Sequence, residues 1–168
     1  MPWPNRSLSL YHGTIGPYAD SIQKKIDLSL LAKPKRDFGR GFYTTRIYTQ
    51  ARRFAIFKFR EALDDHHKKG TIDPQVAAIV EFTINLAALA DLPTLAFVQP
   101  TPDWRDFVAY CRRTGRSHKP NNEYYYAVYG PVHSSRGAIP RTEQLSFHDD
   151  YAISLLHIVR VERWLPPP

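Results

Sequence analysis

The sequence predicts an α+β fold, and three observations indicate this class. Residues 78–84 place an apolar side chain at every second position, which is the period of a β-strand with one buried face. Ala51, Ala55, Phe59 and Ala62 recur at the spacing of one helical face. Predicted strands and helices are interspersed without strict strand–helix alternation, which favours α+β over a doubly wound parallel sheet.

The N-terminal elements are predicted to be a strand, a short helix and a long helix. Residues 7–11 alternate polar and apolar side chains, as a half-buried strand does, and a helix is expected at about residues 18–25. A loop rich in lysine, proline and arginine over residues 33–40 then leads into a glycine-rich turn. The strongest helix signal covers residues 46–69, and Gly70 follows as its stop.

The elements after residue 100 begin with a helix at 102–113, because proline and aspartate occupy its first turn and two arginines its end. The aromatic segment 124–129 predicts a strand that ends at a Gly-Pro pair. A loop over 133–140 is expected to lead into a short strand at 144–148.

The C-terminal part is predicted to be a helix followed by a strand. Asp149 and Asp150 open the helix, which runs to about residue 156, and residues 157–164 form the last strand. Three terminal prolines cannot extend a sheet, so we expect the strand to end before them.

Composition excludes several classes of protein. With 43% hydrophobic residues, residues 1–168 can form one domain with its own core. The single cysteine, Cys111, excludes an intrachain disulfide and a multi-cysteine zinc site, and the histidine spacing predicts no metal site. The longest apolar stretch, 84–98, is too short to span a membrane, and residues 1–10 lack a signal-peptide core. We expect a protein that is cytoplasmic or secreted without a classical signal peptide.

Positive charge is concentrated near the N-terminus. The net charge is +7, but residues 1–60 hold 12 lysines and arginines against three aspartates. A basic segment of this kind indicates a phosphate-bearing partner such as a nucleotide or nucleic acid. A solvated basic surface that keeps the protein soluble is the alternative.

Five short motifs occur in order along the chain. They are Tyr-His-Gly-Thr at 11–14, Asp-Phe-Gly-Arg-Gly-Phe-Tyr at 37–43, Trp-Arg-Asp-Phe-Val at 104–108, Gly-Pro-Val at 130–132 and Gln-Leu-Ser-Phe-His at 144–148. Together they resemble the ADP-ribosyltransferase superfamily, in the branch shared by diphtheria toxin and the poly-ADP-ribose polymerases. The resemblance is closest to an uncharacterised bacterial family of predicted ADP-ribosyltransferases, and it covers nearly the whole chain.

This resemblance implies a split β-sheet with flanking helices and NAD as co-substrate. The implied reaction cleaves the bond between nicotinamide and ribose through an oxocarbenium-like transition state and transfers ADP-ribose to an acceptor. The acceptor is expected to be a protein or a nucleic acid. A bacterial toxin or effector, with a neutralising partner protein, fits this kind of enzyme.

The family's His-Tyr-Glu triad corresponds to His12, Tyr43 and Gln144 as catalytic residues. The resemblance implies that His12 hydrogen-bonds the adenosine ribose and that Tyr43 stacks on the cationic nicotinamide ring. The third residue is usually a glutamate, whose charge favours the cationic transition state. An amide at this position still accepts a hydrogen bond but carries no charge. Glu143 is the substitute if the strand contains a bulge.

Further residues for NAD binding follow from the same motifs: Gly13, Thr14, Arg40, Gly41 and Phe54. Gly13 would bring its backbone close to the nicotinamide carboxamide, Arg40 would pair with the pyrophosphate, and Phe54 would cover the second face of the ring. The structural alternatives are core positions for Tyr43 and Phe54 and a tight turn for Gly39 and Gly41.

Two other functions fit the same residues. An NAD-dependent RNA 2′-phosphotransferase is basic and lacks the glutamate, as here. A catalytically degenerate NAD-binding or RNA-binding module would keep the fold without turnover. Arg136 and Arg141, near the predicted 133–140 loop, would favour an acidic or phosphate-bearing acceptor in the transferase reading.

Overall fold

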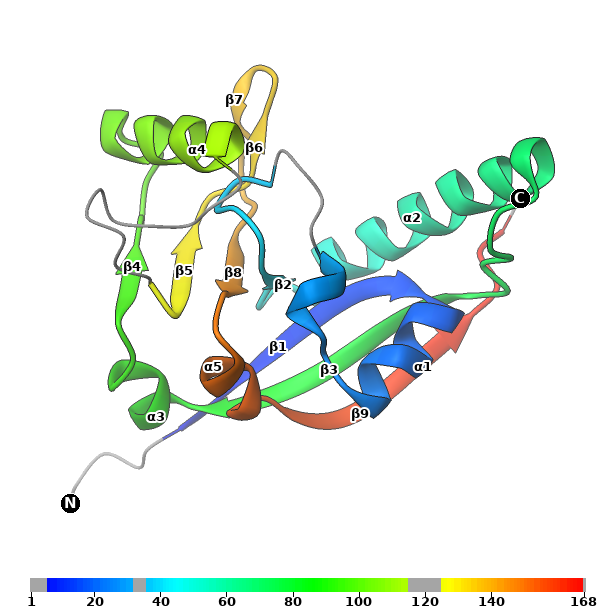
Figure 1. The fold of residues 1–168 in the computed structure, drawn as a ribbon, viewed down its shortest axis with the longest axis horizontal. Coiled ribbons are helices and arrows are strands. Elements are labelled where there is room, and N and C mark those ends of the chain that lie inside the picture. The colour runs from blue at the N-terminus through cyan, green and yellow to red at the C-terminus, as the bar shows by residue number, and fades with distance from the viewer. Residues whose placement is uncertain (1–5, 32–35, 115–124, 168) are drawn as a thin grey trace.

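A computed structural model describes residues 6–31, 36–114 and 125–167. The longest strands form an antiparallel sheet in the order β1-β3-β9, with β1 at Ser7–Ile15, β3 at Ala77–Asn85 and β9 at His157–Trp164. β3 is central and buried on both faces, which agrees with its β-branched and aromatic side chains (Figure 1).

A second sheet has the order β2-β8-β5-β4 and lies beside the first (Figure 1). Its strands are short: β2 Phe42–Thr44, β8 Gln144–Phe147, β5 Ala127–Gly130 and β4 Thr94–Ala96. β4 pairs with β5 in parallel, and the other pairs are antiparallel. After β5 the chain forms a small hairpin, β6 His133–Ser134 with β7 Gly137–Ala138.

The two sheets meet where β1 passes β2. The Tyr11 amide donates to the Thr45 carbonyl at 2.7 Å, and the Thr45 amide donates back to Tyr11 at 3.0 Å. Phe42, Phe82 and Phe147 are buried in one core cluster between the sheets. The middle of β1 is therefore fixed next to the start of the second sheet.

Helices cover both faces of the three-stranded sheet. α1 (Gly16–Lys24) shares a core cluster with the second sheet, whereas α2 (Tyr48–Lys69) packs through Ala51 and Ala55 on the opposite face. α2 lies so close to β1 that a Cβ on Gly13 would be 2.1 Å from the Ala51 carbonyl oxygen. This packing requires a glycine at position 13.

The remaining helices are α3 (Leu86–Ala90), α4 (Pro102–Thr114) and α5 (Asp150–Ser154), with a 3₁₀ turn at Leu28–Leu31. α4 packs on the second sheet, where Trp104 and Val108 are buried with Phe38 and Val128. Asp149 caps α5 by accepting from the Tyr151 amide at 2.8 Å.

The predicted α+β class is confirmed, and most predicted elements are present. β1 extends four residues beyond the predicted strand, and the expected 133–140 loop contains the β6–β7 hairpin. The predicted strand 124–129 is described from residue 125 and begins at Ala127, while residue 124 lies outside the described part. The sequence patterns do not reveal β4 and α3, which are too short to show a period. No helix in the described ranges is long and apolar enough to cross a membrane.

Candidate functional site

A cavity of about 640 Å³ lies where β1, β2 and β8 come together beside α2. Of the predicted site residues, it is lined by His12, Gly13, Tyr43, Phe54 and Gln144. These residues come from four elements, β1, β2, α2 and β8, of which β1 and β8 are more than 120 residues apart in the sequence. The structure therefore brings the three predicted catalytic residues to one cavity.

His12 is held by the backbone of β2. Its Nδ1 lies 2.6 Å from the carbonyl oxygen of Tyr43, and since that oxygen is an acceptor, Nδ1 donates and Nε2 of the neutral ring is an acceptor. The ring stacks on Phe42 with centroids 4.5 Å apart. Burial lowers the pKa of His12 to about 4, and the nearby Arg36 guanidinium acts in the same direction, so the ring is uncharged at neutral pH.

Tyr43 is fixed by its own loop. Its hydroxyl donates to the Gly39 carbonyl at 2.7 Å and accepts from the Phe38 amide at 2.9 Å, and burial raises its pKa well above the usual range. The Arg36 guanidinium lies over the ring, 5.3 Å from its centroid. The ring face of Tyr43 thus already attracts a cation.

Gln144 is almost fully buried, and its amide nitrogen donates to two acceptors. Nε2 donates to Asp37 Oδ2 at 2.6 Å and to the Pro131 carbonyl at 3.2 Å. Both neighbours are acceptors, which fixes the orientation of the amide. Its Oε1 has no hydrogen-bond partner among the residues that the structure describes, and the side chain borders the cavity.

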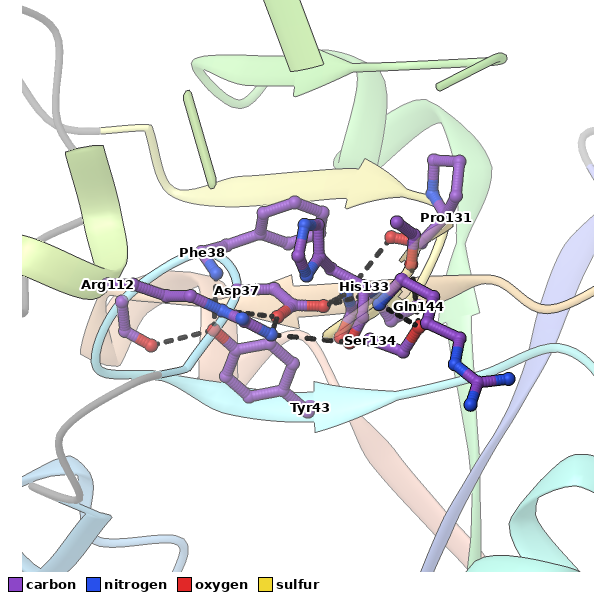
Figure 2. Close-up of polar contacts among 11 residues, drawn as sticks. Asp37, Phe38, Tyr43, Arg112, Pro131, His133, Ser134 and Gln144 are labelled. Atoms are coloured by element: carbon purple, nitrogen blue, oxygen red, sulfur yellow. Dashed lines mark hydrogen bonds and ion pairs between the residues drawn. The ribbon is translucent and has the colours of Figure 1, made fainter. Parts of the chain in front are cut away.

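Asp37 organises this corner of the cavity (Figure 2). Its Oδ1 accepts from Arg112 Nη2 at 2.6 Å and from Nε at 3.1 Å, and its Oδ2 accepts from the His133 amide at 2.7 Å as well as from Gln144. Arg112 also donates to the His133 carbonyl at 3.2 Å. The carboxylate is thereby bonded to three different elements of the chain.

Glu143 does not replace Gln144 in the cavity. Its carboxylate accepts from Arg46 and from the Tyr129 hydroxyl, the latter at 2.7 Å. The Gln50 side chain donates to the backbone carbonyl of Glu143 and accepts from its backbone amide. Burial opposes ionisation, but the bonds from Arg46 and Tyr129 outweigh it and lower the pKa of Glu143. β8 pairs with β5 in regular register, so the bulge that would exchange the two residues is absent from this pair.

Three of the residues predicted to bind NAD lie outside the cavity lining. Thr14 is buried further along β1, and Gly41 packs against His148, whose Nδ1 would be 2.5 Å from an added Cβ. Arg40 borders a separate hollow of about 280 Å³ together with Lys25. Arg40 thus borders a different hollow from the one that His12 and Tyr43 line, and its role at the pyrophosphate stays a prediction.

Gly13 lines the cavity, and it also has a packing role that the motif does not predict. Its missing side chain makes room for the α2 backbone, since an added methyl group would lie 2.1 Å from Ala51 O and 2.9 Å from Ala55 N. Phe54, in contrast, borders the cavity from α2 with 43% of its surface exposed. An exposed aromatic side chain at a cavity mouth is available to a ligand.

The cavity is positively charged. Arg36, Arg53 and Arg141 line it, whereas Asp37 is the single acidic residue among its described lining residues and is paired with Arg112. Within the described ranges no group of three or more histidine, cysteine or acidic residues has the arrangement of a metal site. An anionic organic ligand suits this lining better than a metal ion does.

Sequence patterns alone give no role to Asp37, Arg112 or His133. Asp37 begins the motif at 37–43, so its place in that motif is the available signal, whereas Arg112 is recognisable only as a charge at a helix end. His133 has no partner at a metal-binding spacing and carries no signal of its own. His133 lines the cavity, and its Nδ1 is buried without a hydrogen-bond partner among the described residues. Burial, and to a lesser extent the charge of Arg112, lowers the pKa of His133.

Comparison with known families assigns the chain to one of them. Residues 8–139 match the family described as "Protein of unknown function (DUF3990)". The chain belongs to this family. The match includes β1, β2 and the Asp37 loop but ends before β8, so Gln144 lies outside it. No curated protein and no solved structure matches the chain.

Proposed function

We propose that this DUF3990 protein is an NAD-dependent mono-ADP-ribosyltransferase with an ADP-ribosyltransferase-like split sheet. The observation that carries the proposal is the meeting of His12, Tyr43 and Gln144, from β1, β2 and β8, at one cavity. These are the three residues that the sequence resemblance assigns to NAD. A volume of about 640 Å³ is in the range of sites for organic cofactors.

In this reaction the bond between C1′ of the ribose and N1 of nicotinamide breaks, and its electron pair leaves with nicotinamide, which becomes neutral. The acceptor's nucleophilic atom forms the new bond to C1′, and its proton passes to solvent. Tyr43 holds the cationic ring before cleavage by stacking. Gln144 Oε1 accepts from the 2′-hydroxyl of the nicotinamide ribose, next to C1′ and the ring oxygen, which share the developing positive charge.

The rest of the dinucleotide is bound by uncharged and cationic groups. His12 is neutral, and its Nε2 acceptor takes a hydrogen bond from a hydroxyl of the adenosine ribose. The arginines at positions 36, 53 and 141 supply the charge for the pyrophosphate in place of Arg40. The cation that stacks on Tyr43 in the structure, Arg36, leaves the ring when nicotinamide binds and remains close enough to bind phosphate.

The direct test is release of nicotinamide from NAD by the purified protein, measured by chromatography with and without a cell lysate. We expect release above background, and Tyr43→Ala should abolish it because the ring platform is lost. Tyr151→Ala is the matched control, since that tyrosine is 60% exposed and outside the cavity lining. A folded protein that releases no nicotinamide in either condition would refute the proposal.

An NAD-dependent RNA 2′-phosphotransferase is the second candidate, favoured by the cationic cavity and by an amide at position 144. With NAD and a 2′-phosphorylated RNA, that enzyme would form ADP-ribose cyclic phosphate, whereas a transferase would not. A degenerate binding module would bind NAD in calorimetry without releasing nicotinamide. The toxin or effector role, the neutralising partner and the cellular location remain predictions.

A further inference from the structure

The Gln144 amide is held in a single orientation. Turning it by 180° would set Oε1 against the Asp37 carboxylate and the Pro131 carbonyl, which are both acceptors. The repulsion of three acceptors in a buried place excludes the turned form. Oε1 is therefore left as an acceptor at the cavity, as the carboxylate of a glutamate would be.

The bond from Gln144 to Asp37 is short and charge-assisted. Nε2 lies 2.6 Å from Oδ2, and both residues are more than 90% buried, with 8% and 7% of their surfaces exposed. A donor that is bonded to an anion in a low-dielectric place is polarised, and electron density moves toward the other end of the amide. Oε1 is thus a stronger acceptor than an ordinary amide oxygen.

The other partners of Asp37 leave its Oδ2 to amide donors, one of which is Gln144. Arg112 is bonded to Oδ1, on the other carboxylate oxygen, and the His133 amide shares Oδ2 with Gln144 (Figure 2). The guanidinium anchors the carboxylate without contacting the amide. A catalytic glutamate at position 144 would carry its negative charge at the cavity. Here the charge lies on Asp37, which is joined to the Gln144 side chain by one hydrogen bond.

We propose that Asp37 is a positioning residue that orients and polarises Gln144, so that the amide stabilises the cationic transition state in place of a glutamate. This inference rests on the proposed NAD-cleaving function. It predicts that Asp37 acts on the chemical step more than on NAD binding, because Oε1 is needed most where charge develops.

The test moves the negative charge from position 37 to position 144, across the hydrogen bond that joins the two side chains. Asp37→Asn removes the charge and allows the amide to turn, so kcat for nicotinamide release should fall about 10²-fold with little change in KM. Gln144→Glu places two carboxylates together, which then share a proton, and should also be impaired. The double variant Asp37→Asn with Gln144→Glu puts the charge directly at the cavity and should recover at least tenfold of the lost kcat.

Asp20→Asn is the matched control. Asp20 also bonds an arginine, Arg163, at 2.6 Å, but on the surface, and its loss should leave kcat unchanged. A residue with a purely structural role would make the double variant at least as impaired as the worse single variant, and that result would overturn the inference. An Asp37→Asn variant with unchanged kcat would overturn it as well.

A second measurement needs neither activity nor a substituted protein. In the amide NMR spectrum of the ¹⁵N-labelled wild type, one Gln144 side-chain proton should be shifted downfield and protected from exchange by the bond to Asp37. A Gln144 amide with ordinary shifts and fast exchange would contradict the geometry. If this signal is present but wild-type protein releases no nicotinamide, the proposed function fails and the catalytic role of Asp37 fails with it. Turnover without the signal refutes only the role of Asp37.

Discussion

Two arginine–carboxylate pairs flank the start of β8, and they differ in what they do with the carboxylate. In the first, Arg46 and the Tyr129 hydroxyl occupy the oxygens of Glu143, which is 8% exposed. Its partners come from β5, from α2 and from the segment between β2 and α2, and they hold these parts at the start of β8. Neither Arg46 nor Glu143 lines the cavity, although Gln50 and Gln144 beside them do, so this pair has a structural role.

In the second pair, Arg112 occupies one oxygen of Asp37 and leaves the other for the Gln144 amide and the His133 backbone. Asp37 is buried to the same degree, but it borders the cavity. Burial and pairing with arginine are therefore alike in the two carboxylates. They differ in that Asp37 borders the cavity and is bonded to the Gln144 side chain, which also borders it.

The largest effect on nicotinamide release is expected for Gln144→Leu. This change removes the Oε1 acceptor and should lower nicotinamide release by about 10²–10³ fold. The Asp37 carboxylate keeps Arg112 and the His133 amide, so the protein should remain folded by circular dichroism. Release close to that of the wild type would show that Gln144 is not part of the reaction.

Acid is expected to lower the stability of the protein through His12, which lines the cavity. His12 has a pKa of about 4 in the folded protein and about 6.5 when unfolded, so the unfolded chain binds more protons between these values. The contribution of neutral His12 to the free energy of unfolding is fully present above about pH 6.5. It falls as the pH is lowered toward 4, by at most about 1.4 kcal/mol per pH unit.

Thermal unfolding of the wild type and of His12→Gln from pH 7 to 4 measures this difference. The variant has no group that titrates at this position, so its melting temperature should fall less over the window. Equal slopes for the two proteins would show that His12 is not held neutral by burial.

Glu143→Gln should affect stability and spare the reaction. The substitution removes the charge from a mostly buried hydrogen-bonded pair, and the free energy of unfolding should fall by roughly 1–3 kcal/mol in denaturant titrations. Nicotinamide release measured below the unfolding transition should stay close to that of the wild type. A large loss of kcat in the folded variant would make Glu143, and not Asp37, the carboxylate that supports catalysis.

The smallest effect is expected for Arg46→Lys. The arginine side chain is 48% exposed, and lysine keeps the charge but loses the bidentate geometry, so the cost should be under about 1 kcal/mol. Denaturant unfolding at low and high salt measures it. A cost of several kcal/mol would mean that the bidentate contact of this half-exposed arginine with Glu143 contributes much of the stability at the start of β8.

Local patterns predicted most of the fold. The alternation around Val80 and the helical spacing from Ala51 onward are properties of short stretches of sequence, and both elements are present as predicted. β4 could not be predicted in this way, because its three residues are a strand only through parallel pairing with β5, more than 30 residues later.

The candidate site was predictable where a family motif marks it and not where distant residues meet. His12, Tyr43 and Gln144 were found through motifs, whereas Asp37 contacts partners that lie 75, 96 and 107 residues away. Only the folded chain shows that its carboxylate and the amide of Gln144 are in contact. Arg40 shows the reverse case, since Asp37 and Tyr43 of the same motif line the cavity whereas Arg40 borders the separate hollow.

If NAD occupies the cavity between β1, β2 and β8, NAD titration followed by two-dimensional NMR will show it. We expect saturable shifts concentrated at His12, Tyr43 and Gln144. Shifts confined to the hollow beside Arg40, or no saturable shifts in a folded protein, would contradict it.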